Sequence, residues 1–369
     1  MISTVVHGAK VRRARRIWSL LDAVLRSCVL LLILLLGCLL PASAHADAGE
    51  GEPDCRPDDA LAHAAAELLL QGGPPSTQAL TAALRAADSD LVGARGVYWP
   101  ASASIPRGWL ETQQQKADAQ IVCGYAQSDS GRLLLAAARA GSLELLSADS
   151  HLVHGSIAPD FSDPQLVVED ANGVLFRIAA SRAQLASGIA ISAELARPAR
   201  IQLLARGPAG PRPVAERVLP APGGSVSDAP VVDQPREAQR ALSARERLAA
   251  LRRERGRTAL RDNRALAEVA MRHAEHVCSE GRIAHELTPG ADPTQRLRAL
   301  GISARRVGET VARGASASEA FASFEHSPSH LLTLLEPDFT DVGIGEVSDA
   351  EGRRCVVVLL AAWPRYLGR

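Results

Sequence analysis

The segment Ser327-Pro328-Ser329-His330 is the third of four short signals that decide the fold of the C-terminal third of this chain. Together the signals contain two histidines and a carboxylate, followed by a stretch typical of a buried strand. They predict a polar site built on a strand-containing domain. In chain order they are Ala284-His285 through Thr288-Pro289, Gly308-Glu309-Thr310, Ser327-Pro328-Ser329-His330, and Asp338-Phe339-Thr340-Asp341-Val342-Gly343-Ile344-Gly345.

Two helices are predicted just before these signals. The first spans residues 236–255, and the capping-box spacing of Ser243 and Glu246 offers Ser243 as an alternative start. The second begins after Asp262 or Asn263, either of which can act as an N-cap. Its apolar residues follow the i, i+3, i+4 rule and define a buried stripe. They are Leu266, Val269, Ala270, Ala274 and Val277.

The chain upstream divides into a helical segment, residues 47–95, and a β-rich module, residues 96–219. Residues 58–71 carry Ala and Leu at helical spacing and end at Gly72-Gly73. A second helix runs from the Pro-Pro-Ser sequence that follows to about Ala87, so the pair forms a helical hairpin. Nothing on this hairpin indicates chemistry.

The β-rich module shows short runs with period-two alternation between turn residues, which predicts a sandwich, immunoglobulin-like in character. The strongest hairpin signal is Asn172-Gly173. Alternation also predicts a half-buried strand from Ile189 to Leu195. Residues 220–236 form a linker rich in Pro, Gly, Ser and Ala. The other predicted strands are 121–126, 132–138, 165–168, 174–179, 201–205 and 214–219.

Residues 1–46 have the features of a signal peptide. An arginine-rich stretch at 12–16 precedes the apolar run 28–40, and Ala44-His45-Ala46 offers a cleavage site. The apolar run is short for a membrane span, which needs about 20 residues. The preferred reading is therefore cleavage and export. An alternative is a lipoprotein, because Leu35-Leu36-Gly37-Cys38 resembles a lipobox with Cys38 as the acylated residue.

Composition supports export and excludes one class of partner. The leader holds six basic residues and one acidic residue, so its removal changes a net charge of zero to −5. Lysine occurs only at Lys10 and Lys116, and no basic stripe indicates nucleic-acid binding. Four cysteines remain, and an even number in an exported protein predicts two disulfides. Pairing within each domain is preferred, with free buried thiols as the alternative: Cys55 with Cys123, and Cys278 with Cys355.

The C-terminal signals resemble the bacterial branch of the CAP superfamily, the cysteine-rich secretory, antigen 5 and pathogenesis-related 1 group. The resemblance covers residues 237–369 and implies an α-β-α sandwich with a cleft over a central antiparallel sheet. His285, Glu309 and His330 are the residues that converge in that cleft. The whole chain is thus expected to be an α+β protein. The resemblance rests on two helices separated by Gly256, then His285 before Thr288-Pro289-Gly290, Arg296-Leu297-Arg298-Ala299-Leu300-Gly301, Gly308-Glu309 and Ser327-Pro328-Ser329-His330.

This chain departs from the family pattern at several positions. Thr310 replaces the asparagine that usually follows the motif Gly-Glu, and Phe324 stands where bacterial members have tryptophan. Leu331 replaces the common arginine after the last motif histidine, which removes a charge from the cleft rim. The second glutamate of eukaryotic members has no clear counterpart, and Glu325 is the nearest carboxylate. The central strands that the resemblance implies are residues 342–345 and 355–362, joined by a turn at Gly352.

Two imidazoles and a carboxylate can hold a divalent metal such as zinc, with His285 and His330 as nitrogen ligands. They can equally form a hydrogen-bonded polar cluster. The H-E-x-x-H pattern of helical zinc proteases is absent after His285, and serines downstream of Glu309 lack a nucleophile-elbow context. His273 and His276, one turn apart on the second helix, are expected on a solvated face.

These features favour an exported protein of the bacterial envelope or secretome that binds a ligand without converting it. The ligand classes are a lipid, a peptide, a cell-wall fragment and a divalent metal, with His285, Glu309 and His330 in the cleft. One alternative is a metal-assisted hydrolase of peptides or cell-wall material with Glu309 as general base. Another is a structural or adhesive envelope protein with a vestigial site. Membrane association is expected only if Cys38 is lipidated.

Overall fold

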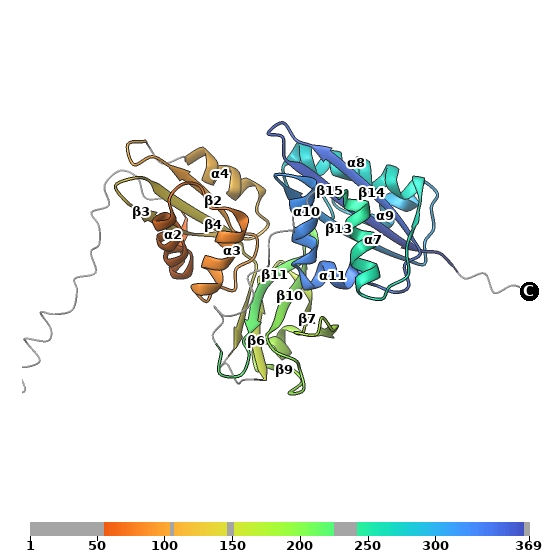
Figure 1. The fold of residues 1–369 in the computed structure, drawn as a ribbon, viewed down its shortest axis with the longest axis horizontal. Coiled ribbons are helices and arrows are strands. Elements are labelled where there is room, and N and C mark those ends of the chain that lie inside the picture. Colours follow the sequence, from red (N-terminus) through yellow and green to blue (C-terminus); the bar gives the residue numbers. More distant parts are fainter. Residues whose placement is uncertain (1–54, 104–106, 146–150, 225–241, 365–369) are drawn as a thin grey trace, which may run out of the picture. The chain divides into compact units, whose positions relative to one another are not determined.

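The computed structural model describes residues 55–103, 107–145, 151–224 and 242–364, which fall in one unit, Pro53–Arg369 (Figure 1). The predicted signal peptide with Cys38, and most of the predicted linker, lie outside these residues. None of the helices described is both long enough and apolar enough to cross a membrane.

Residues 55–139, the first part of the chain that the structure describes, form a sheet with helices packed on it. Helices α2 (Asp59–Gln71) and α3 (Thr77–Ala86) form the predicted hairpin, and α4 (Arg107–Lys116) follows later. In this sheet the strand order is β1-β3-β4-β2. Its strands are β1 (Arg56–Pro57), β2 (Arg95–Trp99), β3 (Gln120–Gln127) and β4 (Arg132–Arg139).

The core of this part crosses the predicted boundary at residues 95/96, so that boundary is wrong. Leu61 and Leu68 of α2 are buried with Leu133 and Leu135 of β4 in one cluster. A side chain at Gly124 would meet the backbone of α2 at 2.0 Å, so a glycine lets helix and strand touch. The helices could not bury their apolar faces without strands that are distant in the sequence.

The later part of the predicted β-rich module, residues 141–219, forms two antiparallel sheets around one core, in the orders β11-β10-β7-β8 and β5-β6-β9, whereas β3 and β4 belong to the sheet described above. The hairpin at Asn172-Gly173 joins β7 to β8 as predicted. The immunoglobulin-like assignment stays a prediction. The elements are β5 (Gly141–Leu145), β6 (Leu152–Ile157), β7 (Ser162–Glu169), β8 (Leu175–Ala179), α5 (Arg182–Ser187), β9 (Ile189–Ala190), β10 (Ala199–Gly207) and β11 (Gly210–Leu219).

The strand predicted from Ile189 to Leu195 is mostly wrong, because only Ile189–Ala190 pairs. After that point the chain turns. The Ser192 hydroxyl accepts a hydrogen bond from the N–H of Glu194 at 3.2 Å, and Leu195 N–H donates to Ser192 O. A serine side chain that bonds to nearby backbone competes with a strand ladder in this way.

The C-terminal domain is the expected α-β-α sandwich around a sheet of order β12-β14-β15-β13. Ser243 caps α7 in a full capping box, and Asn263 caps α8, as predicted. Gly352, with φ of 78°, lies in the turn between β14 and β15. The elements are α7 (Ala244–Glu254), β12 (Arg261–Asp262), α8 (Arg264–Glu280), α9 (Pro293–Arg298), β13 (Arg306–Gly314), α10 (Ala317–Glu325), α11 (Pro328–Leu334), β14 (Asp341–Ser348) and β15 (Arg354–Ala362).

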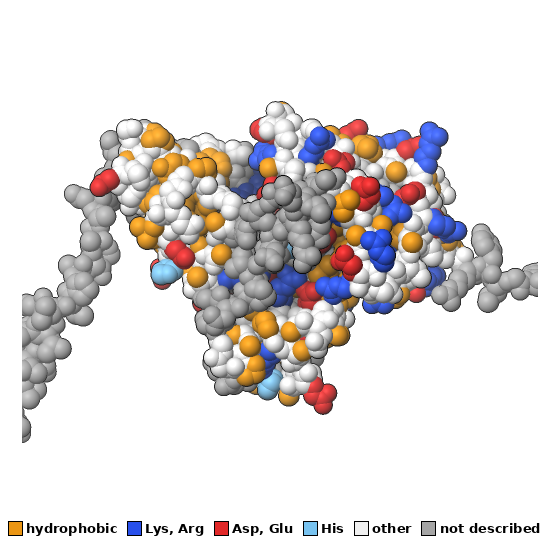
Figure 2. Space-filling view, viewed as in Figure 1, with side chains coloured by type: hydrophobic (Ala, Val, Ile, Leu, Met, Phe, Trp, Pro, Cys, Tyr) orange, Lys and Arg blue, Asp and Glu red, His pale blue; other side chains and the backbone are white. Residues whose placement is uncertain are grey.

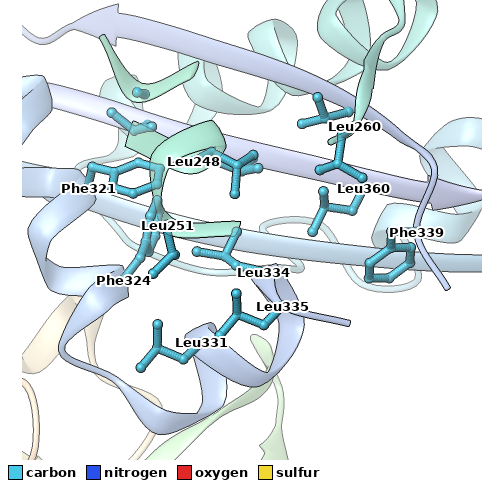
Figure 3. Packing of buried hydrophobic residues seen from close by; sticks show 14 of the residues in the cluster. Leu248, Leu251, Leu260, Phe321, Phe324, Leu331, Leu334, Leu335, Phe339 and Leu360 are labelled. Atoms are coloured by element: carbon cyan, nitrogen blue, oxygen red, sulfur yellow. The ribbon is translucent and has the colours of Figure 1, made fainter. Parts of the chain in front are cut away.

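The apolar run of β15 is buried on both faces, which explains why it does not alternate with polar residues. Val357 and Leu359 belong to the cluster under α8, whereas Val358 and Leu360 belong to the cluster under α7, α10 and α11. Figure 3 shows the second cluster, in which two phenylalanines of α10 meet leucines of α7 and α11. The two layers of helices therefore fix the strand that pairs with β13, where the site glutamate lies.

Both predicted disulfides form. Cys55 bonds to Cys123 in the first part of the chain, and Cys278 bonds to Cys355 between α8 and β15. Each bridge is internal to one core: Cys278–Cys355 ties α8 to β15, and Cys55–Cys123 ties the residue before β1 to β3.

Candidate ligand site in the C-terminal domain

The three predicted site residues come from three different elements. His285 lies in the connection between α8 and α9, Glu309 lies on β13, and His330 lies in the first turn of α11. Pro328 occupies the start of α11, where a missing N–H costs no helical hydrogen bond. Glu309 is opposite Leu359 in the register of β13 and β15, and this places it under α8.

Glu309 is the centre of a buried polar cluster, because its side chain is only 1% exposed. His285 Nδ1 lies 2.9 Å from Glu309 Oε1, so the ring donates its Nδ1 proton to the carboxylate. Arg296 of α9 bonds to the other oxygen, Oε2, and also donates to the carbonyl of His285 at 2.8 Å. The carboxylate thus positions both the histidine and the arginine.

Burial by itself would raise the pKa of the Glu309 carboxyl. The hydrogen bond from His285 and the positive charge of Arg296 outweigh burial and hold that pKa below its ordinary value. The group is therefore ionised and fully engaged, and it has little capacity to accept a further proton. This environment disfavours Glu309 as a general base.

His273 completes the cluster from α8, and the prediction that it lies on a solvated face is wrong. It is 2% exposed, its Nε2 donates to Ala284 O at 2.9 Å, and the same atom lies 3.7 Å from Glu309 Oε1. His276 is exposed as expected. In the sequence, His273 continues the stripe of Val269 and Ala270 at helical spacing, and this signal could have found it.

His330 lines the same cavity as His285, but the structure shows no hydrogen bond between these two histidines. Its ring packs edge-on against Phe324, with centroids 5.2 Å apart. Its Nδ1 is buried and has no hydrogen-bond partner in the described part of the chain. A buried polar atom without a partner costs free energy, so it is a natural point of attachment for a ligand.

A cavity of about 300 Å³ adjoins both histidines. Its wall is formed by the C-terminal domain, by β11 and by the first part of the chain. The C-terminal residues among its lining are Gly281, Arg282, Ile283, Ala284, His285, Val311 and His330.

The residues present do not fit a divalent cation. Among the residues that the structure describes, no three His, Cys, Asp or Glu side chains are arranged to hold a metal ion. Both oxygens of Glu309 are already bonded, one to His285 and one to Arg296. A guanidinium at the carboxylate repels a second positive charge at that position.

The structure shows where the departures from the family pattern lie in the fold. Phe324 is fully buried in the core, as expected of the aromatic residue at that position. Leu331 is 1% exposed and belongs to the same core, so the expectation that it changes the cleft rim is wrong. Thr310 is also fully buried, on β13. Glu325 pairs with Arg247 on the far side of α10 and is not part of the site.

The strand pair β10–β11 holds both motif segments. Ala209, in the turn between these strands, accepts hydrogen bonds from the N–H groups of His285 at 3.2 Å and Glu286 at 3.1 Å. Gln202 of β10 is 3% exposed, and its Oε1 accepts from Ser327 Oγ at 3.2 Å and from Ser329 N–H at 3.1 Å. The β-rich module therefore holds the backbone at His285 and the segment just before His330.

The pH dependence of stability should report the environment of His330. Burial lowers the pKa of its imidazole to about 3, and the charge of His285 acts in the same direction. A histidine in an unfolded chain has a pKa of about 6.5. Below that pH the unfolded chain therefore binds a proton that the folded chain excludes. The unfolding free energy of the unchanged protein should therefore fall as the pH is lowered from ~6 to ~4. In His330→Gln we expect this fall to be smaller by about 1 kcal/mol per pH unit.

The measurement is urea unfolding at several pH values, with the exposed His276→Gln as the matched control. Identical pH slopes for the unchanged protein and His330→Gln would contradict the assignment of a buried, neutral imidazole.

Comparison with known proteins supports the family resemblance for this domain. The model of the CAP family, described as the cysteine-rich secretory protein family, matches residues 245–360. No curated protein matches the chain. One similar solved structure is an outer surface protein of Borrelia burgdorferi, 24% identical, covering 32% of this chain and 90% of that chain, with a TM-score of 0.31.

Two further solved structures are similar over parts of the chain. One is an extracellular protein with an SCP domain from Bacillus anthracis, at 20% identity, 32% and 39% coverage, and a TM-score of 0.28. The other is a cysteine-rich secretory protein from Staphylococcus aureus, at 13% identity, 65% and 84% coverage, and a TM-score of 0.27. With TM-scores below 0.5, these likenesses support no inference about function. The family match and the three-layer fold together show that this chain carries a CAP domain at its C-terminal end.

Proposed function

We propose that this is an exported, non-enzymatic binding protein whose CAP domain holds a small organic ligand between His285 and His330. The observation that carries the proposal is the cavity of about 300 Å³ that both rings line, together with the unpartnered Nδ1 of His330. That volume is at the lower end of the range for small-molecule pockets. A short peptide side chain, a lipid headgroup or a cell-wall fragment would fit it.

Binding is a better interpretation than hydrolysis because both oxygens of the Glu309 carboxylate already have hydrogen-bond partners. Glu309 is bonded to His285 and Arg296, and its lowered pKa makes it a weak base. The serines after it have structural partners: Ser316 caps α10, and Ser318 Oγ accepts from Arg247 at 2.9 Å. No activated nucleophile accompanies the cavity among the described residues.

Export is supported by the two disulfides, since such bonds persist in oxidising compartments. A cleaved soluble form and a form anchored at Cys38 remain the two proposals for the mature protein.

Titration of the full protein with two four-carbon probes, butyramide and butyrate, tests the binding site. With histidines labelled with ¹⁵N, at least one probe should produce saturable shifts of the ring nitrogens of His285 and His330. His330→Ala should weaken that binding by about tenfold, the effect of losing one good hydrogen bond. His276→Ala should leave it unchanged. If neither probe shifts either ring, the cavity is not a binding site.

A further inference from the structure

The same cavity is lined by more positive than negative side chains. Four basic residues contribute to its wall: Arg95, Lys116, Arg212 and Arg282. A single carboxylate, Asp118, is present among the residues that line it. Arg212 pairs with that carboxylate through two nitrogens, one of them at 3.1 Å, so this pair is electrically neutral. Arg282 lies 3.9 Å from Glu280, which is outside the wall, so Lys116 and Arg95 are the two cations of the wall without a carboxylate partner among the described residues.

Lys116 and Arg95 make few contacts of their own. The ammonium of Lys116 has no hydrogen-bond or ion-pair partner in the described part of the chain. Lys116 lies beside the C-terminal end of α8, because a side chain at Gly281 would meet its Nζ at 2.7 Å. Arg95 donates only to the amide oxygen of Gln113, at 3.4 Å. Among the residues that the structure describes, neither cation forms an ion pair with a carboxylate.

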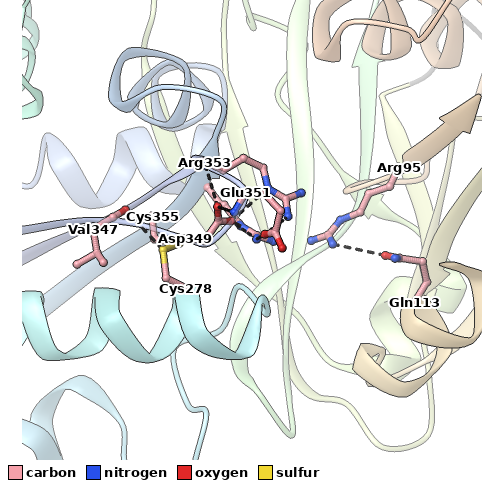
Figure 4. A network of polar contacts seen from close by, with 9 residues as sticks. Arg95, Gln113, Cys278, Val347, Asp349, Glu351, Arg353 and Cys355 are labelled. Carbon is pink, nitrogen blue, oxygen red and sulfur yellow. Dashed lines mark hydrogen bonds and ion pairs between the residues drawn. A yellow bond between two sulfur atoms is a disulfide. The ribbon is translucent and has the colours of Figure 1, made fainter. Parts of the chain in front are cut away.

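Carboxylates on the neighbouring β14–β15 turn are already occupied. Asp349 accepts from Arg313 at 2.8 Å and from Arg353 at 3.2 Å, and Glu351 accepts from Arg353 at 2.8 Å (Figure 4). On the face shown in Figure 2, acidic and basic side chains are interspersed over the CAP domain. The excess positive charge of the cavity is therefore a local feature and not the end of a basic surface on that face.

Two nitrogen atoms in the wall lack a hydrogen-bond partner although they are buried. They are the Nε of Arg282 and the Nδ1 of His330. A guanidinium nitrogen can only donate, so the first atom requires an acceptor. The remaining lining is largely apolar. It includes Ile121, Ala137, Pro211, Ile283 and Val311.

We infer that the cavity binds a small organic anion, a carboxylate or a phosphate monoester, whose charged group meets Lys116 and Arg282 and whose short apolar part lies against the alanine and isoleucine side chains. This inference rests on the proposed binding function and adds the charge of the ligand to it. A neutral headgroup would leave the half-buried charge of Lys116 without a counter-charge, whereas an anion compensates it and also offers an acceptor to the buried Nε of Arg282. Arg95 adds a third positive charge to the wall.

The test compares isosteric probes on the full protein by ¹⁵N-histidine titration: butyrate, n-butyl phosphate and butyramide. At least one anion should bind about tenfold more tightly than butyramide, the gain expected of charge-assisted hydrogen bonds, and this advantage should shrink with added salt. The stronger of the two anions identifies the headgroup, and equal affinities indicate that negative charge alone is recognised.

Lys116→Gln should bring the ratio of anion to butyramide affinity close to one, and Lys116→Arg should restore it. Arg264→Gln is the matched control, because this exposed arginine lies on the outer side of α8 and carries the same charge. If butyramide binds as tightly as both anions, the cavity function stands and the inference about charge is wrong. If none of the three probes binds, both are wrong.

Discussion

Replacing Glu309 by glutamine should lower the free energy of unfolding of the CAP domain by about 3–5 kcal/mol, because one partner of a buried ion pair is then lost. Arg296 would face a neutral amide, and the ring of His285 would lose its charged acceptor at 2.9 Å. The amide has nearly the same volume, so the loss reports charge and not a cavity. Hydrogen exchange of the β15 amides measures this free energy locally.

Two control variants make this expectation specific. Glu268→Gln removes a carboxylate from an exposed pair with Arg264 and should cost at most about 1 kcal/mol. The double variant Glu309→Gln with Arg296→Gln should be more stable than Glu309→Gln alone, since it removes the uncompensated charge. If Glu309→Gln is as stable as the unchanged protein, the buried ion pair does not stabilise the domain.

Removal of the disulfide between Cys278 and Cys355 should lower the free energy of unfolding by a similar amount. The bridge closes a loop with a sequence separation of 77 residues, for which the loss of loop-closure entropy in the unfolded state predicts about 4.5 kcal/mol. Cys355 is fully buried and Cys278 nearly so, so a double alanine variant avoids burying hydroxyl groups. Exchange of the β15 amides again provides the measurement, here without reductant.

The bridge between Cys55 and Cys123 provides the comparison, because its sequence separation of 68 residues is nearly the same. Its removal should accelerate exchange in β3 and leave β15 protected. Equal protection of β15 with and without the Cys278–Cys355 bridge would show that the domain does not depend on this bridge.

Local signals in the sequence predicted much of the fold correctly. Asn263 begins α8, Asn172-Gly173 turns β7 into β8, and the unbroken apolar run near the C-terminus is a strand covered on both faces. Each of these depends on a few adjacent residues. The boundary at 95/96 failed because β2 pairs with β4, about forty residues later, and that pairing unites the helices and strands in one core.

The site was predicted only in part, for a similar reason. His285, Glu309 and His330 were found through the family pattern, and the structure brings His285 into direct contact with Glu309. Arg296 was visible in the motif series, but its bond to the carboxylate depends on how α9 folds back over β13. That bond bears on the chemistry, because the carboxylate of the possible metal site is half of a buried ion pair.

The hydrogen bonds that join β10 and the turn after it to both motif segments limit how this chain can evolve. Gln202 bonds to Ser327 and Ser329, and the turn at Ala209 bonds to the backbone at His285. A recombination event that replaced the β-rich module would remove two acceptor atoms, Gln202 Oε1 and Ala209 O, and the four hydrogen bonds that they receive from the CAP domain. Descendants that keep the domain should therefore inherit the module with it, and a change at Gln202 should be accompanied by a change at Ser327.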